Sequence, residues 1–436
     1  MLLQTRRTSK IVKGTEISID MSKAKVSLIG IIGSIVCMLS IVACGGGETR
    51  PGAVSVDPKS ETVSISVSGT HSGSYSASAS GTHSGSASAS GSASASGSAS
   101  ASGSASASGT HSGHSESEAV EGSAEMGGYA PASDVATHAL VVLDVQEINE
   151  LLGADTIDFG AVKTIYEDGK NSVKSSGSVR TIAGYARNAD RSEAIWDDYV
   201  AHYGDSTWLD SYVSAALDGT GAFEGESDGV RKQGVQKGIQ NQIMISWTIH
   251  ELVAAMAKAA DGNFDAAKGA PHNWDEAWAF YHGDAPSSGP FGTANKRGDN
   301  FGTGTSVNDT ILAEMIVGRD ALLSGDVDTA QAAADEIIRQ IHITYIQASI
   351  RYASKMGSDL AGGDTDKARV HQAEGLSFYM VIEPMVAAAD SSAADTISGV
   401  YDLSNEAADP GSSVLEALES VYSALGISAD EIGSLS

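Results

Sequence analysis

Residues 329–356, TAQAAADEIIRQIHITYIQASIRYASKM, decide the fold class of this chain. Apolar side chains recur three and four positions apart along the whole stretch, which predicts a helix that buries one face. The same spacing recurs at 192–203, 239–259, 308–323 and 411–425, often after an Asp, Ser or Asn that would cap the helix. Because the only strand-like run is ALVVLDV at 139–145, we predict an all-α helical bundle.

Two of these segments resemble each other in sequence. QIMISWTIHELVAAMAK at 242–258 aligns with QIHITYIQASIRYASKM at 340–356, an offset of 98 residues. The segments that follow them, HNWDEAWAFY at 272–281 and HQAEGLSFYM at 371–380, align at an offset of 99. We therefore predict an internal duplicated helix-pair repeat, packed about a pseudo-twofold axis.

The repeat places a histidine three residues before a carboxylate in each half. These pairs are His272 with Asp275 and His371 with Glu374. Residues at i and i+3 share one helix face, and helix bundles build di-iron and di-manganese sites from His and carboxylate side chains that point inward. We therefore predict a metal site that these four side chains share between the two halves. The alternative for each pair is an ordinary surface contact or helix cap.

Three neighbouring side chains are further candidate metal ligands. Glu276 lies four residues after His272, and its counterpart in the other half is Gly375. His250 and Glu251 lie on the partner helix, although His250 shares the face of Trp247 and fits the core equally well. Imidazole and carboxylate without sulfur favour iron, manganese or zinc over copper(I).

The second polar stretch, GPFGTANKRGDNFGTG at 289–304, is rich in glycine and is predicted to be a loop. Its polar residues Asn295, Lys296 and Arg297 include two adjacent cations in an acidic protein, which suggests an anion-binding loop or a cover for the metal site. The alternative is a structural loop whose Asn, Asp and Gly residues supply turns.

The N-terminal third of the chain has the composition of a targeting segment followed by a spacer. Basic residues precede an uncharged apolar run that ends at IVAC, which predicts a lipoprotein signal peptide over 1–43 and lipidation of Cys44. Residues 44–128 are rich in Gly, Ser, Ala and Thr, so we predict a disordered tether before a folded domain at 129–436. We expect an outer-membrane or cell-surface lipoprotein that faces the periplasm or the exterior.

The charge and the cysteine content exclude several functions. The net charge of −28 becomes −32 without residues 1–43, so the general electrostatic field disfavours nucleic acid as a partner. Of the two cysteines, Cys37 would leave with the signal peptide and Cys44 would carry lipid. The mature domain then has no disulfide, thiolate metal site or cysteine nucleophile.

The two motifs PHNWDEAWAFYHG at 271–283 and GTANKRGDNFGT at 292–303 resemble the low-iron-inducible periplasmic proteins, also called iron-assimilating proteins. The resemblance extends over about 133–410, and it implies iron as the metal and iron uptake outside the cytoplasm as the role. The predicted lipid anchor and long tether depart from this family.

The sequence supports a binding protein more than an enzyme. The leading prediction is a membrane-tethered domain that captures iron for uptake and passes it to an iron transporter or receptor. One alternative is a di-metal oxidase or ferroxidase that uses the same ligands, and another is a surface adhesion or structural module without metal. No catalytic residue is predicted.

Overall fold

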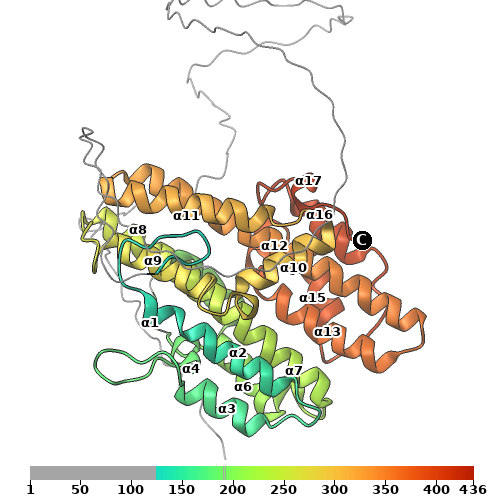
Figure 1. Cartoon of the computed structure of the whole chain (residues 1–436). Helices are drawn as coiled ribbons and strands as arrows, with labels where there is room; N and C mark the ends of the chain where they lie inside the picture. The colour runs from blue at the N-terminus through green and yellow to red at the C-terminus, as the bar shows by residue number, and fades with distance from the viewer. Residues whose placement is uncertain (1–123, 190, 192) are drawn as a thin grey trace, which may run out of the picture. The chain divides into compact units, whose positions relative to one another are not determined.

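The computed structural model describes residues 124–189, 191 and 193–436, and helices dominate this part of the chain (Figure 1). It contains two isolated bridges, Met126 with Tyr129 and Val173 with Val179, but no strand within the described residues. The all-α prediction is confirmed, and residues 139–145 belong to helices and the turn between them. The predicted signal peptide, Cys44 and nearly all of the predicted tether lie outside the described residues.

The first half of the domain contains mostly short helices. In chain order they are α1 (Ala136–Ala139), α2 (Val141–Leu152), α3 (Phe159–Asp168), α4 (Ile182–Ala186), α5 (Ala194–Tyr203), α6 (Trp208–Asp218), the 3₁₀ turn η1 (Gly221–Phe223), α7 (Asp228–Lys237), the π-helical turn η2 (Gly238–Ile243) and α8 (Met244–Ala260).

The second half contains the longest helices. They are α9 (Ala270–Tyr281), the 3₁₀ turn η3 (Pro286–Ser288), α10 (Pro290–Phe301), α11 (Ser306–Ser324), α12 (Val327–Ala361), α13 (Thr365–Tyr379), α14 (Glu383–Ala389), α15 (Ser391–Tyr401), α16 (Ser413–Val421) and α17 (Ala429–Ile432).

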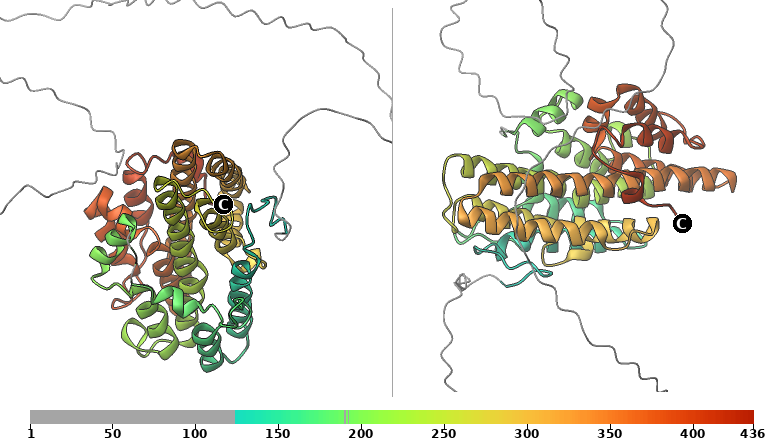
Figure 2. Two further views of the ribbon diagram at one scale, coloured as in Figure 1. Left: turned by 90° about the vertical axis from the view of Figure 1, so that its left-hand side faces the viewer. Right: turned by 90° about the horizontal axis from the view of Figure 1, so that it is seen from above.

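Residues 329–356 lie within α12, a helix of 35 residues that extends along the domain (Figure 2). It packs against α11 and α13, and also against α8. Asp326 caps α12 by accepting a hydrogen bond from the Thr329 N–H, and Asp364 caps α13 in the same way at Lys367. These caps satisfy backbone donors that a helix start leaves unpaired. Among the segments for which a cap was predicted, the prediction is therefore confirmed at α12, whereas α5, α11 and α16 have no side-chain cap hydrogen bond.

Both segments of the predicted repeat form packed helix pairs. The first pair is α8 with α9 and the second is α12 with α13. The common origin of the two pairs stays a prediction.

The aromatic residues of 271–283 anchor α9 in the core. Trp274 and Trp278 are fully buried, and their indole N–H groups donate to the carbonyl oxygens of Met315 and Met126 at 2.8 and 2.9 Å. Gly318 on α11 makes room for Trp274, because a Cβ at this position would lie 2.0 Å from the indole Cζ2. The two tryptophan side chains therefore hold α9 in place.

The prediction of a loop at 289–304 is wrong, because residues Pro290–Phe301 form α10. Pro290 opens the helix, where its missing N–H costs nothing. Gly298 serves close packing rather than a turn, since a Cβ there would lie 1.9 Å from the Gly304 carbonyl oxygen. Only Gly302 and Gly304, after the helix, have the positive φ that the turn prediction required.

The packed part of the chain begins before the predicted boundary at residue 129. Met126 is buried, and its carbonyl oxygen accepts the Trp278 hydrogen bond. Tyr129 is fully buried. Within the described residues, no helix combines the length and the apolar character that a membrane crossing requires.

Candidate metal-binding site

Two histidines and a glutamate converge where α1 packs against α9. His272 and Glu276 are one turn apart on α9, and the Nε2 atom of His272 lies 3.1 Å from the Oε1 atom of Glu276. His138, near the end of α1, places its Nε2 atom 3.0 Å from the same oxygen. The side chains of the three residues are only 12–21% exposed. One carboxylate oxygen therefore joins two imidazoles from distant parts of the chain.

A cavity of about 340 Å³ opens beside this cluster. Its lining includes His138, Arg180, Glu251, Glu276 and Tyr185. An ion or small molecule can therefore reach the carboxylates from solvent.

A hydrogen-bonded chain fixes the tautomer of His272. Asp275 accepts hydrogen bonds from Tyr129 Oη at 2.5 Å and from Ser133 Oγ at 2.7 Å. Because the Ser133 hydroxyl donates to Asp275, its oxygen accepts from Nδ1 of His272 at 2.8 Å. The Nδ1 proton is thus committed, and neutral His272 presents a lone pair at Nε2.

The tautomer of His138 is fixed by a cation. The Arg180 Nη2 atom lies 2.6 Å from Nε2 of His138, and a guanidinium can only donate. Nε2 of His138 therefore carries a lone pair as well, while Nδ1 of this ring has no hydrogen-bond partner. The Nε2 atoms of both imidazoles thus lie within 3.1 Å of Glu276 Oε1, and a proton on either ring can be donated to this oxygen.

A second buried carboxylate lies beside Glu276. Asn273 donates to Oε2 of Glu251 at 2.5 Å and to Oε2 of Glu276 at 3.4 Å. Burial raises the pKa of Glu251 well above its ordinary value, and the Glu276 carboxylate raises it further. Burial alone would raise the pKa of Glu276 too, but the protons that His138 and His272 donate to its carboxylate when these imidazoles are charged outweigh the burial and hold the pKa low. The pair can bind one proton or cation.

The spacing of these atoms can be compared with that of metal ligands. Bonds of about 2.0–2.1 Å to nitrogen and oxygen place two ligands at right angles about 3.0 Å apart. The two distances from Glu276 Oε1 to the imidazoles are close to this value, and they are also the ordinary length of an N–H···O hydrogen bond. Nevertheless, no group of three or more His, Cys, Asp or Glu side chains within the described residues has the arrangement that could hold a metal ion. In this arrangement Arg180 lies against Nε2 of His138.

The structure does not bring the four predicted ligands into one group. His371 on α13 lies 2.5 Å from Asp359 through its Nδ1 atom, and Glu374 forms an ion pair with Lys237 at 3.5 Å. Asp275 supports His272 through Ser133 instead of facing a metal position. The predicted site between the halves is not formed, because α9 and α13 direct their polar side chains toward different neighbours.

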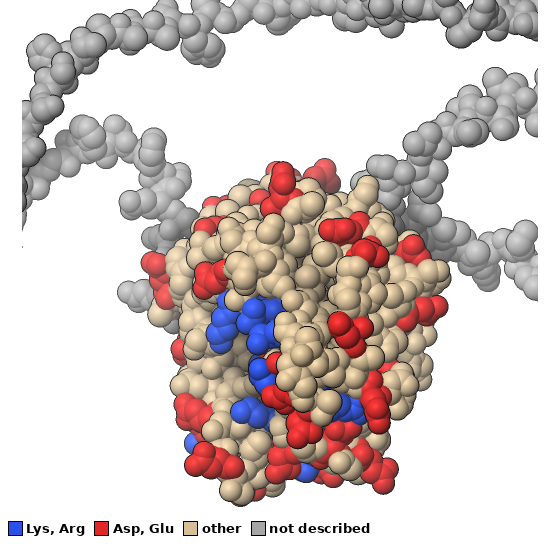
Figure 3. All heavy atoms as spheres, turned by 90° about the vertical axis from the view of Figure 1, so that its right-hand side faces the viewer, with Lys and Arg blue, Asp and Glu red and all other residues tan. Residues whose placement is uncertain are grey.

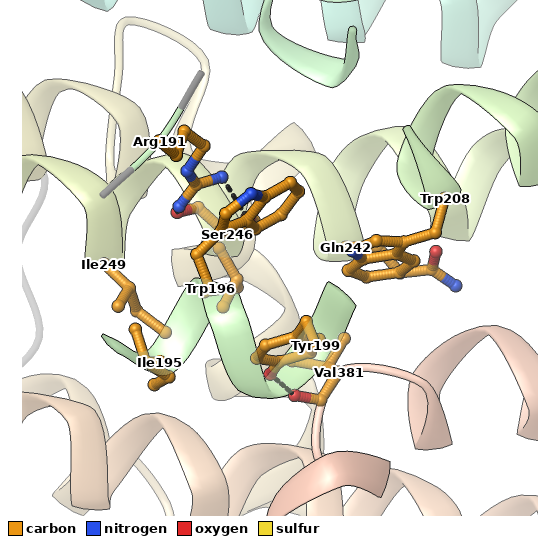
Figure 4. A pocket seen from close by; sticks show the side chains of 10 residues that line it. Arg191, Ile195, Trp196, Tyr199, Trp208, Gln242, Ser246, Ile249 and Val381 are labelled. Atoms are coloured by element: carbon orange, nitrogen blue, oxygen red, sulfur yellow. Dashed lines mark hydrogen bonds between the residues drawn. The ribbon is translucent and has the colours of Figure 1, made fainter. Parts of the chain in front are cut away.

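His250 is also engaged elsewhere. Its Nδ1 atom lies 2.7 Å from Oε1 of Glu193, which Arg191 contacts at 2.6 Å. Arg191 also bonds to Ser246 beside a small apolar cavity, shown in Figure 4. This cavity holds about 10 Å³, which is room for one water molecule and no larger ligand.

Sequence reasoning found His272, Glu276 and Glu251 as neighbours, and it missed His138 and Arg180. Both lie outside the helix pairs of the predicted repeat. The only signal for His138 was a lone histidine before the apolar run at 139–145, which no sequence spacing connects to α9.

The domain is thus a helical bundle with a buried cluster of imidazoles and carboxylates beside a solvent-accessible cavity. The sequence model of the family described as low iron-inducible periplasmic protein matches residues 101–436, and the chain belongs to this family. The family description supports an extracytoplasmic role related to iron. No curated protein and no solved structure matches the chain.

Proposed function

We propose that this protein binds iron outside the cytoplasm as cargo for uptake, at the cluster of His138, His272, Glu276 and Glu251. The observation that carries the proposal is the convergence of the Nε2 atoms of two imidazoles on one carboxylate oxygen, at 3.0 and 3.1 Å. When His272 is neutral, the lone pair of its Nε2 atom faces the carboxylate oxygen of Glu276, and a proton or a metal ion between the two atoms removes the repulsion. The family description, which names low iron, favours iron as that metal.

The cluster suits reversible capture. Imidazole and carboxylate groups are suitable ligands for iron, and this cluster has no thiolate that would retain the metal. Iron would displace the proton that otherwise joins Nε2 of His272 to Glu276, so binding is coupled to pH. Binding also requires the Arg180 guanidinium to leave Nε2 of His138. Arg180 can then neutralise the second carboxylate or an anion that arrives with the metal.

The route to and from the membrane is the other part of this proposal. Lipidation of Cys44 would hold the domain at a membrane through the Gly/Ser/Ala-rich segment. A membrane transporter or receptor would receive the iron.

A ferroxidase is the second candidate, and the adjacent carboxylates of Glu251 and Glu276 favour it. Carboxylate pairs of this kind bridge two irons in helix bundles that react with oxygen. Oxygen consumption on addition of Fe(II) separates an oxidase from a binding protein, which takes up iron without turnover.

The test measures iron bound per protein and affinity for Fe(II) under anaerobic conditions and for Fe(III) citrate. We expect Glu276→Gln, His138→Ala and His272→Ala to weaken iron binding at least about tenfold, an effect of about 1.4 kcal/mol each. The double variant with His138→Ala and His272→Ala should lose little more iron affinity than either single variant, since the ligands act as a unit. His202→Ala and His371→Ala are the controls and should bind iron as the wild type does. Normal binding by Glu276→Gln would refute the proposal, and loss of binding in His371→Ala would restore the site between the halves.

A further inference from the structure

A second polar cluster lies where α7, α10, α12 and α13 meet. The rings of Tyr352 and Phe378 stack with centroids 5.3 Å apart and planes 16° apart. The guanidinium carbon of Arg297 lies 5.5 Å from the Tyr352 ring centroid and 5.9 Å from that of Phe378. The Nζ atom of Lys237 lies 5.9 Å from the Phe378 centroid. Two cations thus lie near the same stacked pair of aromatic rings, at distances where cation–π attraction operates.

The positive charge in this cluster is balanced only in part by the described residues. Arg297 is 6% exposed, and its Nε and Nη1 atoms are buried without a hydrogen-bond partner. The acidic partner of Lys237 is Glu374, whose Oε1 atom lies 3.5 Å from Nζ. Lys296 adds a third cation, since it and Arg297 both repel Lys237. Buried ions require partners that satisfy their donors, and one carboxylate cannot serve this group.

The chemistry of Lys237 shows the cost of this arrangement. Burial lowers its pKa, Glu374 opposes that effect, and Arg297 and Lys296 lower the pKa further. Asp359, a nearby carboxylate, already pairs with His371 and Lys367. It is therefore not available to neutralise the cations.

One face of this acidic protein carries a concentration of positive charge. Figure 3 shows the side of the domain on which α13 and the end of α10 lie in Figure 1. Lys and Arg side chains gather around a hollow on this face, whereas Asp and Glu side chains are spread over much of the rest. In a chain of net charge −28, such a concentration attracts anions locally.

We infer that Arg297 and Lys237, with the nearby Lys296, bind a small oxyanion. The unpaired guanidinium N–H groups are donors for phosphate or carboxylate oxygens, and Lys237 supplies a point charge. The burial of Arg297 restricts the occupant to a small molecule. Lys296 and Arg297 are the two cations that the sequence predicted for an anion-binding loop, and they lie in helix α10. The inference does not include Asn295, whose Oδ1 atom accepts from Asn308 at 2.8 Å.

The experiment measures binding of inorganic phosphate and of citrate to the full chain by titration calorimetry and thermal shift. Chloride at matched ionic strength controls for screening. We expect at least one probe to bind and to raise the melting temperature, and the choice between them identifies a phosphate or a carboxylate ligand. Binding of neither probe overturns the inference.

Matched variants locate the binding. Lys237→Met should weaken it about tenfold or more while folding normally, since a buried charge is removed. Glu374→Gln should strengthen it, because the one acid that competes with the ligand becomes neutral. Lys232→Met on the same helix is the control and should have no effect. Equal anion binding in Lys237→Met, or weaker binding in Glu374→Gln, contradicts the inference. Iron binding by Lys237→Met should be unchanged, which keeps this test separate from that of the metal site.

Discussion

Asp275 and Glu276 are neighbours in the sequence, yet their carboxylates serve opposite sides of the His272 imidazole. Asp275 reaches Nδ1 of the ring through Ser133, whereas Glu276 lies 3.1 Å from Nε2. Each residue of a helix is rotated by about 100° from the last, so adjacent side chains cannot share a face. One carboxylate therefore orients the imidazole and the other meets its lone pair.

This relationship predicts a positioning role for Asp275. Asp275→Asn should weaken iron binding about 10- to 100-fold, as loss of a carboxylate behind a ligating histidine generally does. The helical content should stay near that of the wild type. Iron titration together with circular dichroism checks this result, and Ser133→Ala should reproduce it. The exposed Asp299→Asn variant is the control, and unchanged affinity in Asp275→Asn would show that the chain through Ser133 has no influence on the site.

The close approach of Gly318 to Trp274 predicts a packing defect that is independent of the site chemistry. Gly318→Ala puts a methyl group 2.0 Å from the indole Cζ2, so Trp274 must shift. We expect a loss of about 1–3 kcal/mol in the free energy of unfolding, the usual cost of overpacking. Urea denaturation measures it.

Gly399→Ala is the matched control for this substitution. Gly399 lies within α15, and a Cβ there would meet nothing within 4 Å. This variant should be neutral or stabilised by up to about 1 kcal/mol, since alanine favours the helix. Equal effects of the two substitutions would mean that Trp274 is not held as described.

The buried His342 predicts a specific loss of stability in acid. Burial lowers its pKa to about 4 from an ordinary value of 6.5, and its Nε2 atom has no hydrogen-bond partner. The folded state therefore binds the proton more weakly than the unfolded state. The stabilisation is complete above pH 6.5 and is lost as the pH falls toward 4, by about 3 kcal/mol in total.

The measurement compares the free energy of unfolding of the wild type and of His342→Gln between pH 7 and pH 4. The wild type should lose more stability over this interval, and the difference between the two proteins should narrow or reverse by pH 4. His202→Ala serves as the control and should follow the wild type. Parallel curves for wild type and His342→Gln would contradict the assignment.

The N-terminal segment predicts where the chain can be shortened. A chain that begins at residue 124 should fold and bind iron as the full chain does. One that begins at residue 131 loses Tyr129, which is fully buried and donates to Asp275. It also loses the Met126 carbonyl that accepts from Trp278. We expect this second chain to be less stable by about 3 kcal/mol or more, the scale of deleting a buried aromatic side chain. Equal melting temperatures for the two chains would contradict this boundary.

Local spacing in the sequence determined the helices and one half of the candidate site. Helical periodicity repeats every 3.6 residues, so residues 329–356 indicated a helix, and His272 with Glu276 could be placed on one face of α9. The glycines of α10 misled the prediction, because glycine marks a close contact as readily as a turn.

Only the tertiary structure decided which polar groups meet. His138 joins Glu276 because α1 packs on α9, and no periodicity relates these two helices. Packing also directs His371 toward Asp359 and not toward His272, although the sequences around the two histidines align. Arg297 and Lys237 both lie near the Phe378 ring for the same reason. A helix pattern fixes the side of its own axis on which a residue lies, while the partner across the interface depends on how the helices cross.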